Sequence, residues 1–130
     1  MAVAVCYETP TRFARYTVAD GTGIPKGTLL QLATPETATA ATSDNDIVGG
    51  IAWMEKVAHD GSTEIVAALD GVWGITTTAA AVTIGSFVGI GGTNEIKVFT
   101  AGDNELGYCI GRALETCAAA VVLKVRVWCV

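Results

Sequence analysis

Short apolar runs separated by turn residues make up most of the chain. Val, Ile, Leu and Thr recur in these runs, and Gly, Asn or an Asp-Gly pair follows them. This pattern is typical of β-strands joined by tight turns, because β-branched side chains pack well on a pleated sheet and Gly, Asn and Asp tolerate turn conformations. The pattern predicts a mainly β protein with strands at residues 12–18, 28–33, 47–54, 63–69, 72–76, 86–90, 95–99, 106–110 and 121–130.

One segment has a helix-favouring composition. Residues 111–120 are rich in Ala and also contain Leu, Glu and Arg, which have high helix propensity. We therefore expect at most one short helix, of one or two turns, between two strands. The Thr- and Ala-rich residues 34–46 are expected to form an exposed hairpin or loop.

A weak internal repeat organises the rest of the chain. Residues 27–32 (Gly-Thr-Leu-Leu-Gln-Leu) match residues 85–90 (Gly-Ser-Phe-Val-Gly-Ile) at an offset of 85 − 27 = 58 residues. At the same offset, residues 47–49 fall on 105–107 and the strand at 64–69 falls on 122–127. Two similar halves in tandem explain this match, and their closure removes exposed sheet edges. The sequence therefore predicts a small β-barrel, or β-tulip, built from two similar halves.

Residues 1–24 stand outside this repeat, and Pro and Gly residues interrupt them. We predict an N-terminal extended arm at residues 1–24 and a single β-barrel domain at residues 25–130. Such an arm would add as a strand to a neighbouring subunit or partner protein, with aromatic side chains in pockets and arginines on carboxylates. Its candidate contact residues are Tyr7, Arg12, Phe13, Arg15 and Tyr16. The alternative is that the segment forms the first barrel strand of its own subunit.

Composition and charge exclude some classes of function. The 130 residues are 51% hydrophobic and 16% charged, which gives one domain a sizeable core. Eight Lys and Arg against 13 Asp and Glu give a net charge of −5, which disfavours direct nucleic-acid binding. The mean hydropathy is +0.46, but no apolar run approaches the ~18 residues of a membrane helix. The first residues lack a basic region followed by a signal-length apolar stretch, so we expect synthesis in the cytoplasm without a cleaved signal.

The charged residues are unevenly distributed. Residues 36–105 contain ten acids but only Lys56 and Lys97 as bases. Most of the other bases lie near the two ends of the chain, at Arg12, Arg15, Arg112, Lys124 and Arg126. If the terminal segments lie together, the molecule has a less acidic pole that suits an acidic partner surface. The alternative is an ordinary solvated surface.

No segment has the residues of a known catalytic, metal or cofactor site. His59 lies in His-Asp-Gly-Ser, which is typical of a surface turn, and residues 89–94 lead into a strand where a dinucleotide loop needs a helix. Residues 44–46 (Asp-Asn-Asp) lack the Gly and Glu of a calcium loop. We predict no enzymatic activity, no metal and no cofactor.

The cysteines and tryptophans are predicted to pack rather than react. The four cysteines form no Cys-x-x-Cys pair and have apolar neighbours, so we expect core thiols; a disulfide between Cys6 and Cys129 would require adjacent terminal strands. Trp53, Trp73 and Trp128 fall in predicted strands, where core or subunit-interface packing is expected. The alternative is a ligand pocket among Trp53, His59 and Trp73.

The order and spacing of several short motifs resemble a known family. The motifs are Ile24–Leu32, Val48–Ala52, Asp60-Gly61, Ala68–Trp73, Ile84–Val88, Gly107–Glu115 and Val125–Val127. Together they resemble the small capsid decoration (cement) proteins of tailed double-stranded DNA phages, over about residues 12–127. The individual motifs are glycines and apolar residues, so the resemblance rests on their succession.

This resemblance implies a β-barrel or β-tulip with an N-terminal arm that assembles as a homotrimer on the outer surface of the phage head. It also implies that the protein stabilises the head by clamping neighbouring major capsid proteins. The family offers no catalytic residue to carry over. We therefore expect a virion protein whose partners are the major capsid protein and its own copies, with no direct contact to nucleic acid or membrane. The alternatives are a small β-barrel enzyme or ligand-binding module, and another structural barrel of the head or tail.

Overall fold

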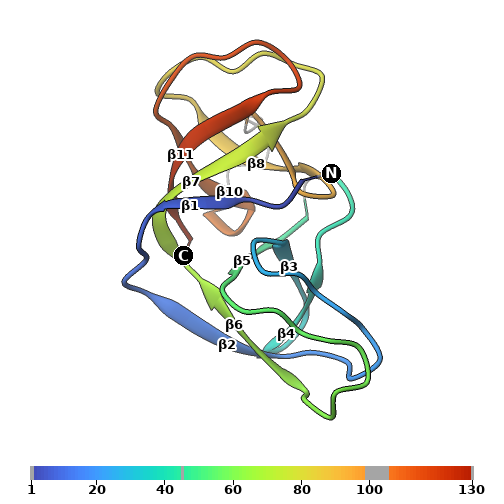
Figure 1. Cartoon of the computed structure of the whole chain (residues 1–130). Helices are drawn as coiled ribbons and strands as arrows, with labels where there is room; N and C mark the ends of the chain where they lie inside the picture. The colour runs from blue at the N-terminus through green and yellow to red at the C-terminus, as the bar shows by residue number, and fades with distance from the viewer. Residues whose placement is uncertain (1, 45, 99–105, 130) are drawn as a thin grey trace.

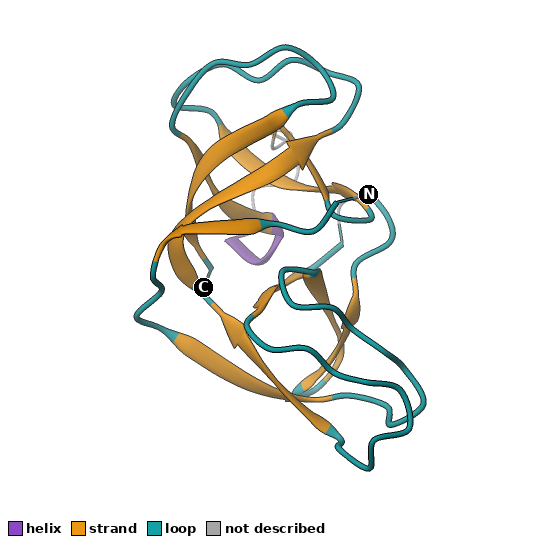
Figure 2. Cartoon of the chain, viewed as in Figure 1, coloured by secondary structure: helices purple, strands orange, loops and turns teal. Residues whose placement is uncertain are grey.

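The computed structural model describes residues 2–44, 46–98 and 106–129, and these are almost entirely strands and loops (Figure 2). This confirms the mainly β fold class. The 3₁₀ turn η2 (Leu106–Tyr108) precedes β10. The strands are β1 (Val5–Glu8), β2 (Phe13–Thr17), β3 (Leu29–Thr34), β4 (Thr37–Ala40), β5 (Val48–Ala52), β6 (Glu64–Ala68), β7 (Asp70–Thr77), β8 (Phe87–Gly92), β9 (Glu95–Val98), β10 (Cys109–Ala113) and β11 (Val122–Trp128).

The strands form two closed barrels of the same design (Figure 1). Barrel 1 has the order β2-β4-β3-β5-β6, and barrel 2 has the order β7-β9-β8-β10-β11 with β1 added to the outside of β7. In each barrel a short parallel pairing closes the ring, between β2 and β4 in the first and between β7 and β9 in the second. The predicted construction from two similar halves is therefore confirmed.

The predicted offset of 58 residues relates most of the equivalent strands. Leu30 pairs with Ala40 in barrel 1, and Val88 pairs with Val98 in barrel 2. The β3–β4 and β8–β9 turns each place one residue at positive φ, Glu36 at 53° and Asn94 at 55°.

The expected match of residues 47–49 with 105–107 is wrong. β5 begins at Val48 and β10 at Cys109, an offset of 109 − 48 = 61 residues. The chain between β9 and β10 is three residues longer than the chain between β4 and β5 (10 against 7). Glu105, which the sequence matched to Ile47, lies outside the described residues.

One other expectation from the sequence is corrected, and the hairpin expected at residues 34–46 is present. Residues 111–120 do not form helical turns: β10 extends to Ala113 because this segment supplies the barrel strand equivalent to β5, and pairing with β8 and β11 outweighs helix propensity. Residues 34–46 contain β4, whose Thr and Ala residues pair with β3 in an antiparallel hairpin.

The N-terminal segment pairs with both barrels. Phe13–Thr17 pairs along its length with β6 as a strand of barrel 1, and Val5–Glu8 pairs with β7. β2 is thus a strand of its own subunit's barrel, as in the alternative prediction, and β1 is an added strand on β7 outside the closed ring.

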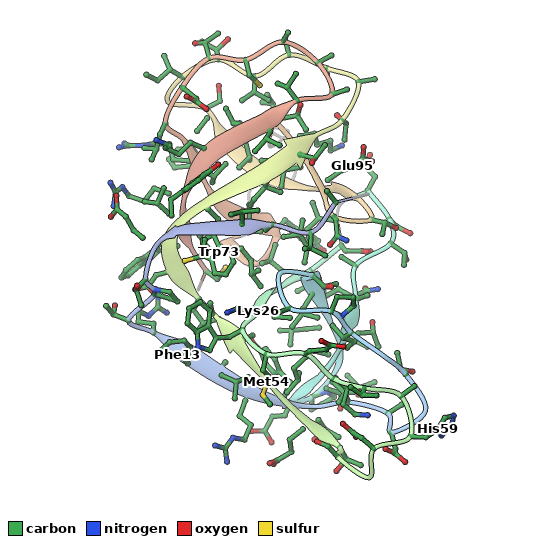
Figure 3. All side chains as sticks on the ribbon, viewed as in Figure 1. Phe13, Lys26, Met54, His59, Trp73 and Glu95 are labelled. Carbon is green, nitrogen blue, oxygen red and sulfur yellow. The ribbon has the colours of Figure 1, made fainter. Side chains whose placement is uncertain are left out.

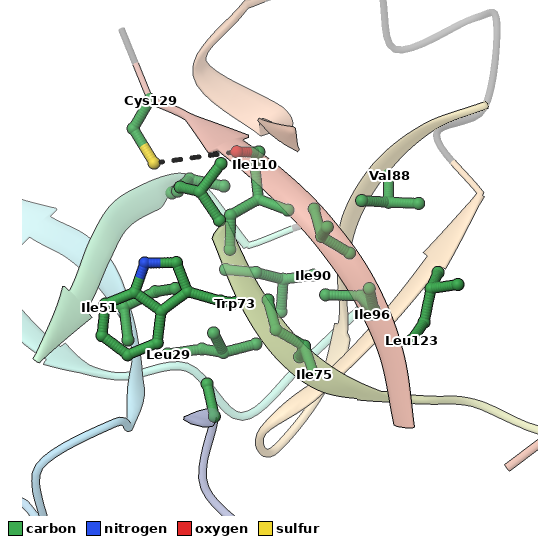
Figure 4. Close-up of a cluster of buried hydrophobic side chains, with 14 of the residues drawn as sticks. Leu29, Ile51, Trp73, Ile75, Val88, Ile90, Ile96, Ile110, Leu123 and Cys129 are labelled. Atoms are coloured by element: carbon green, nitrogen blue, oxygen red, sulfur yellow. Dashed lines mark hydrogen bonds between the residues drawn. The ribbon is translucent and has the colours of Figure 1, made fainter. Parts of the chain in front are cut away.

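One buried core spans both barrels (Figure 4). Leu29 and Ile51 from barrel 1 pack in the same cluster as Trp73 and Ile75 from barrel 2. A smaller cluster, which includes Val18, Leu30 and Ile65, fills the rest of barrel 1. The Asn94 side chain adds a polar link, because its Oδ1 accepts a hydrogen bond from the Leu29 amide at 3.0 Å. The two halves are thus packed as one body.

β1 crosses the junction of the two barrels as a strap. The Ala4 amide donates to the Gly27 carbonyl of barrel 1 at 2.9 Å, and Val5 and Cys6 then pair with β7 of barrel 2. Gly27 has φ of 90°, and a Cβ there would lie 2.4 Å from the Ala4 carbonyl oxygen. Only glycine therefore allows the strap to approach barrel 1 this closely.

Gly85, the equivalent position in barrel 2, provides a control for this contact. Its φ is 86°, but a Cβ there would meet no atom within 4 Å. We expect Gly85→Ala to lower the free energy of unfolding by about 1 kcal/mol, the cost of an L-residue at positive φ. Gly27→Ala should cost more than about 2 kcal/mol, because it adds the clash with the strap. Urea denaturation measures both, and equal losses would contradict the strap contact.

Candidate protein-binding surface

β11 presents a basic and aromatic row to solvent. Its residues alternate: Leu123, Val125 and Val127 are buried, and Val122, Lys124, Arg126 and Trp128 are exposed. This is the period-two pattern of a strand with one face in the core. Trp128, at 61% exposure, is among the most exposed large side chains of the described residues.

Neighbouring strands extend this row sideways. Arg126 is in register with Arg112 on β10, and Arg112 is in register with Phe87 on β8, so the three exposed side chains lie on one face of the sheet. On the other side of β11, β7 lies between β11 and β1. We define the terminal face by its exposed and half-buried side chains: Tyr7, Arg12, Phe87, Arg112, Lys124, Arg126 and Trp128.

The terminal face is less acidic than the rest of the protein. Within the described ranges, its four bases make no ion pair, whereas Arg15, Lys56 and Lys97 each pair with an acid. The sequence predicted a less acidic pole if the terminal segments lie together. The structure brings Arg12, Arg112, Lys124 and Arg126 to one face, but it leaves Arg15 beside Glu64 on barrel 1.

Tyr7 fits on this face because Gly74 has no side chain. It lies over Gly74 of β7, where a Cβ would come within 2.7 Å of the Tyr7 ring. The Lys124 ammonium lies 5.4 Å from the centroid of the same ring, a cation–π arrangement. Tyr7 therefore presents a fixed, half-exposed aromatic surface next to a positive charge.

Arg12 and Trp128 form a second cation–π pair. The Arg12 guanidinium carbon is 4.3 Å from the Trp128 ring centroid. Its Nη1 atom is buried and has no hydrogen-bond partner among the described residues. A pocket of about 290 Å³ opens beside this pair, lined by Thr11, Arg126 and Trp128 among others. Trp128 thus forms one wall of a hollow on the terminal face, and the acids Glu8 and Asp70 also line it.

Asp70 fixes the backbone that carries Arg12. The buried carboxylate accepts hydrogen bonds from the Thr11 amide at 2.7 Å, the Thr11 hydroxyl at 2.6 Å and the Arg12 amide at 3.0 Å. Burial raises the pKa of the Asp70 carboxyl, but these hydrogen bonds and the Arg12 charge outweigh it and hold that pKa below its ordinary value. Asp70 therefore binds the β1–β2 connection as a carboxylate.

Removing the Asp70 charge should loosen this connection. We expect Asp70→Asn to lower the free energy of unfolding at pH 7 by about 1–2 kcal/mol, the cost of weakened charge-assisted hydrogen bonds. Because the folded pKa is depressed, this stability is present above the unfolded pKa of about 3.9 and is lost as pH falls through the folded pKa. Chemical denaturation between pH 7 and 3 should show the difference from wild type shrinking. The exposed Glu55→Gln serves as control, and a constant difference would contradict the role of the carboxylate.

Three aromatic residues connect the surface to the core near the barrel junction. The Phe13 and Trp53 ring centroids are 5.8 Å apart, and Trp53 meets Trp73 edge-on at 6.0 Å. The Lys26 ammonium lies 4.5 Å from the Trp53 ring centroid. Figure 3 shows Phe13, Lys26 and Trp73 close to one another between the two barrels. Phe13 is exposed and Trp53 half-buried, so this cluster reaches the surface.

The remaining predicted arm residues, Arg15 and Tyr16, lie on opposite faces of β2. Arg15 points outward, 3.9 Å from Glu64, with both side chains mostly exposed. Tyr16 packs against the smaller core of barrel 1, and burial raises the pKa of its hydroxyl. The structure thus brings Tyr7 and Arg12 to the terminal face, leaves Phe13 and Arg15 on neighbouring surfaces, and buries part of Tyr16.

The three tryptophans differ in exposure: Trp73 is buried, Trp53 is half-buried and Trp128 is exposed. Trp73 is 1% exposed and its indole donates to the Asp70 carbonyl at 3.0 Å, so of the two expected settings, core or subunit interface, it occupies the core. His59 lies in a turn at the far end of barrel 1, well away from Trp73 (Figure 3). The alternative pocket of Trp53, His59 and Trp73 is therefore not formed.

Substitution should separate the core tryptophan from the surface tryptophan. We expect Trp73→Ala to lower the free energy of unfolding by about 3–5 kcal/mol, because it leaves a cavity in the shared core. Trp128→Ala should cost at most about 1 kcal/mol, the value of an exposed cation–π pair. Guanidinium denaturation followed by far-ultraviolet circular dichroism measures both. Similar losses for the two variants would contradict this assignment.

The cysteines and acidic residues offer no metal or redox site within the described ranges. No group of three or more His, Cys, Asp or Glu side chains is placed to hold a metal ion there. The four cysteines are free thiols, and Cys6 and Cys129 cannot meet as partners on adjacent strands because β7 lies between β1 and β11. Burial raises the pKa of the Cys129 thiol to about 12, which suits a core residue.

The other candidate motifs are turns. Residues 89–94 run along β8 into the β8–β9 turn, as expected from the sequence. Asp46 accepts hydrogen bonds from the Thr42 and Ser43 amides, both at 2.9 Å, and so closes its own loop. Asn45 lies outside the described residues. Among the described residues, the structure contains no helix long and apolar enough to cross a membrane.

Sequence reasoning did not select all residues of the terminal face. Lys124, Arg126 and Arg112 were noted only as terminal bases, although the alternation of apolar and basic residues along 122–128 indicates a one-sided strand. Phe87 follows a Gly and a small hydroxyl residue, as its buried counterpart Leu29 does. The local sequence therefore does not indicate that Phe87 is exposed.

Comparison with solved structures shows a similarity in fold. No family model and no curated protein matches the chain. Among solved structures, the chain is similar to the N base of the head fibre protein gp8.5 of bacteriophage phi29, with a TM-score of 0.55 and 13% identity. The similarity covers 89% of this chain and 94% of that chain. At this level of identity the likeness shows the fold, over nearly the whole length of both chains.

Proposed function

We propose that the protein is a structural component of a phage head, attached to the outer surface of the capsid. The observation that carries this proposal is the shared fold with the N base of the phi29 head fibre protein, over 89% of the chain. The resemblance of the sequence motifs to capsid decoration proteins independently leads to the same class of protein. A fold alone does not determine function, so the surface of the chain has to fit the proposed role.

The exposed surface fits a protein that binds other proteins. Tyr7, Phe87, Val122 and Trp128 are each more than half exposed, and three bases lie among them without a carboxylate partner in the described structure. Aromatic side chains and arginine are the residue types that are enriched in protein interfaces. The major capsid protein is the partner we propose for this surface.

We further propose that the protein assembles as a homotrimer and stabilises the head by clamping neighbouring major capsid proteins. The exposed apolar side chains support contacts of both kinds, because burying them between chains is favourable at about 25 cal/mol per Å². Clamping would stabilise the head by mass action, since the protein would bind the assembled lattice and not the dissociated subunits.

Reconstitution on phage heads tests the proposal. Heads from a phage mutant that lacks the protein are mixed with the purified chain, and electron cryomicroscopy is used to locate added density. We expect regular three-fold density on the outer surface in many copies per head, and heads that withstand higher temperature than untreated ones. Lysozyme, a monomer of similar mass, serves as control. Absence of added density would contradict the proposal, and a few copies at one vertex would identify a head-completion or tail component instead.

A further inference from the structure

The two barrels carry equivalent loops at opposite ends of the molecule. We define tip 1 as residues 20–28 and 55–60 of barrel 1, and tip 2 as residues 78–86 and 116–121 of barrel 2. The two loops of each tip are joined by one isolated bridge, Ile24 to Lys56 in tip 1 and Val82 to Cys117 in tip 2. Figure 1 shows tip 2 at the top of the molecule and tip 1 at the lower right.

The backbones of the two tips match in detail. The His59 amide donates to the Asp20 carbonyl at 2.7 Å, and the Ala120 amide donates to the Thr78 carbonyl at 2.8 Å. His59 and Ala120 both have positive φ, at 62° and 57°. The bridges and the positive-φ residues therefore align the two tips up to His59 and Ala120, after which the β5–β6 connection has three residues more than the β10–β11 connection (11 against 8).

Tip 1 is charged. It contains Asp20, Lys26, Glu55, Lys56, His59 and Asp60. The Lys56 ammonium is buried and donates to Asp60 Oδ1 at 2.9 Å and to the Asp20 and Val57 carbonyls at 2.9 and 2.7 Å. The hydrogen bond from Lys56, followed by that from Ser62, lowers the pKa of the Asp60 carboxyl. Ion pairs thus hold this end together while its acids face solvent.

Tip 2 contains no ionisable side chain except the Cys117 thiol. Its two loops include Ala79–Ala81 and Ala118–Ala120, all exposed. Cys117 stands at the position of Lys56. Val121 corresponds to Thr63, so the shorter connection of barrel 2 has no residue at the place of Asp60. Ile84, the counterpart of Lys26, is 61% exposed. The end of barrel 2 is therefore an uncharged surface of alanine and small hydroxyl residues with the exposed Ile84, where barrel 1 carries charges.

The fold does not require this difference, because tip 1 forms the same bridge and the same positive-φ turn with charged residues. Exposed charges are readily hydrated, whereas exposed apolar surface gains free energy when a partner covers it. Small side chains also let a partner backbone approach closely. From this contrast we propose that tip 2 is the end that docks on the head, and that tip 1 faces solvent; this inference rests on the proposed function.

The surface around tip 2 indicates the chemistry of its partner. β11 runs directly from tip 2 and carries Lys124 and Arg126 on the terminal face, with Arg112 beside them. The flank of tip 2 thus carries three bases and one acid, Glu115, whose carboxylate accepts a hydrogen bond from the Lys124 amide at 3.1 Å. An uncharged contact with this net positive flank fits a capsid surface whose apolar patch is bordered by carboxylates. A nucleic acid fits less well, because a chain of net charge −5 with so few bases on this face neutralises few phosphates.

A matched pair of substitutions tests this orientation. Ala119 and Ala58 are exposed and precede the positive-φ residues Ala120 and His59 in equivalent turns. We expect Ala119→Asp to weaken binding to heads that lack the protein by at least about tenfold, because it buries an unpaired carboxylate facing acids. Ala58→Asp should stay within about twofold of wild type. Fluorescence-detected sedimentation with labelled protein measures both affinities, and melting temperatures confirm that both variants fold.

A second pair repeats the comparison in the other loop. Ala80→Asp in tip 2 and Thr22→Asp in tip 1 replace exposed, equivalent residues, and only Ala80→Asp should weaken binding. The orientation would be overturned if both tip 2 variants bound heads as tightly as wild type. It would also be overturned if the tip 1 variants lost as much affinity as the tip 2 variants. Loss of self-association with unchanged head binding would assign tip 2 to contacts between copies and also overturn it. A wild-type chain that does not bind heads would instead overturn the proposed function.

Discussion

Strand β7 is the element on which both barrels and the terminal face depend. It pairs with β1, β9 and β11, so it closes barrel 2 and holds the strap that crosses to barrel 1. Its first residue, Asp70, binds the Thr11–Arg12 backbone, and Trp73 fills the core between the halves. Gly74 leaves room for Tyr7. A change in β7 therefore affects the core, the strap and the surface together.

The shared core fixes the relative orientation of the two barrels more tightly than a flexible linker would. Leu29 and Ile51 of barrel 1 share a buried cluster with residues of barrel 2, and Asn94 bonds across the junction. Buried contacts between the halves mean that a docking surface on one barrel fixes the direction in which the other points. The orientation of the whole chain on a partner thus follows from the end that binds.

Much of the fold could be predicted from the sequence, because apolar runs and turn residues mark most strands and the repeat relates the halves. β4 was missed because Thr37–Ala40 has no large apolar residue, and its pairing with β3 makes it a strand. The prediction of a strand at 106–110 covers only the start of β10, because Gly111–Ala113 were counted with the alanine-rich residues that follow, whose composition gives no information on tertiary pairing. The site was harder: Trp73 and Trp128 both lie in strands, and only the neighbours of each strand determine which one is buried.

Comparison of equivalent positions in the two barrels shows which residues the fold needs and which residues can differ with the surroundings of each end. Gly27 and Gly85 are both glycine at positive φ, which the shared turn demands. Lys56 and Cys117 occupy equivalent bridges with opposite chemistry, so the fold accepts either a buried ion pair or an apolar contact there. Where equivalent backbones carry different side chains, the cause has to lie in what each end of the molecule faces. For a protein with two similar barrels, the charged end has the surface suited to water, and the uncharged end has the surface suited to a partner.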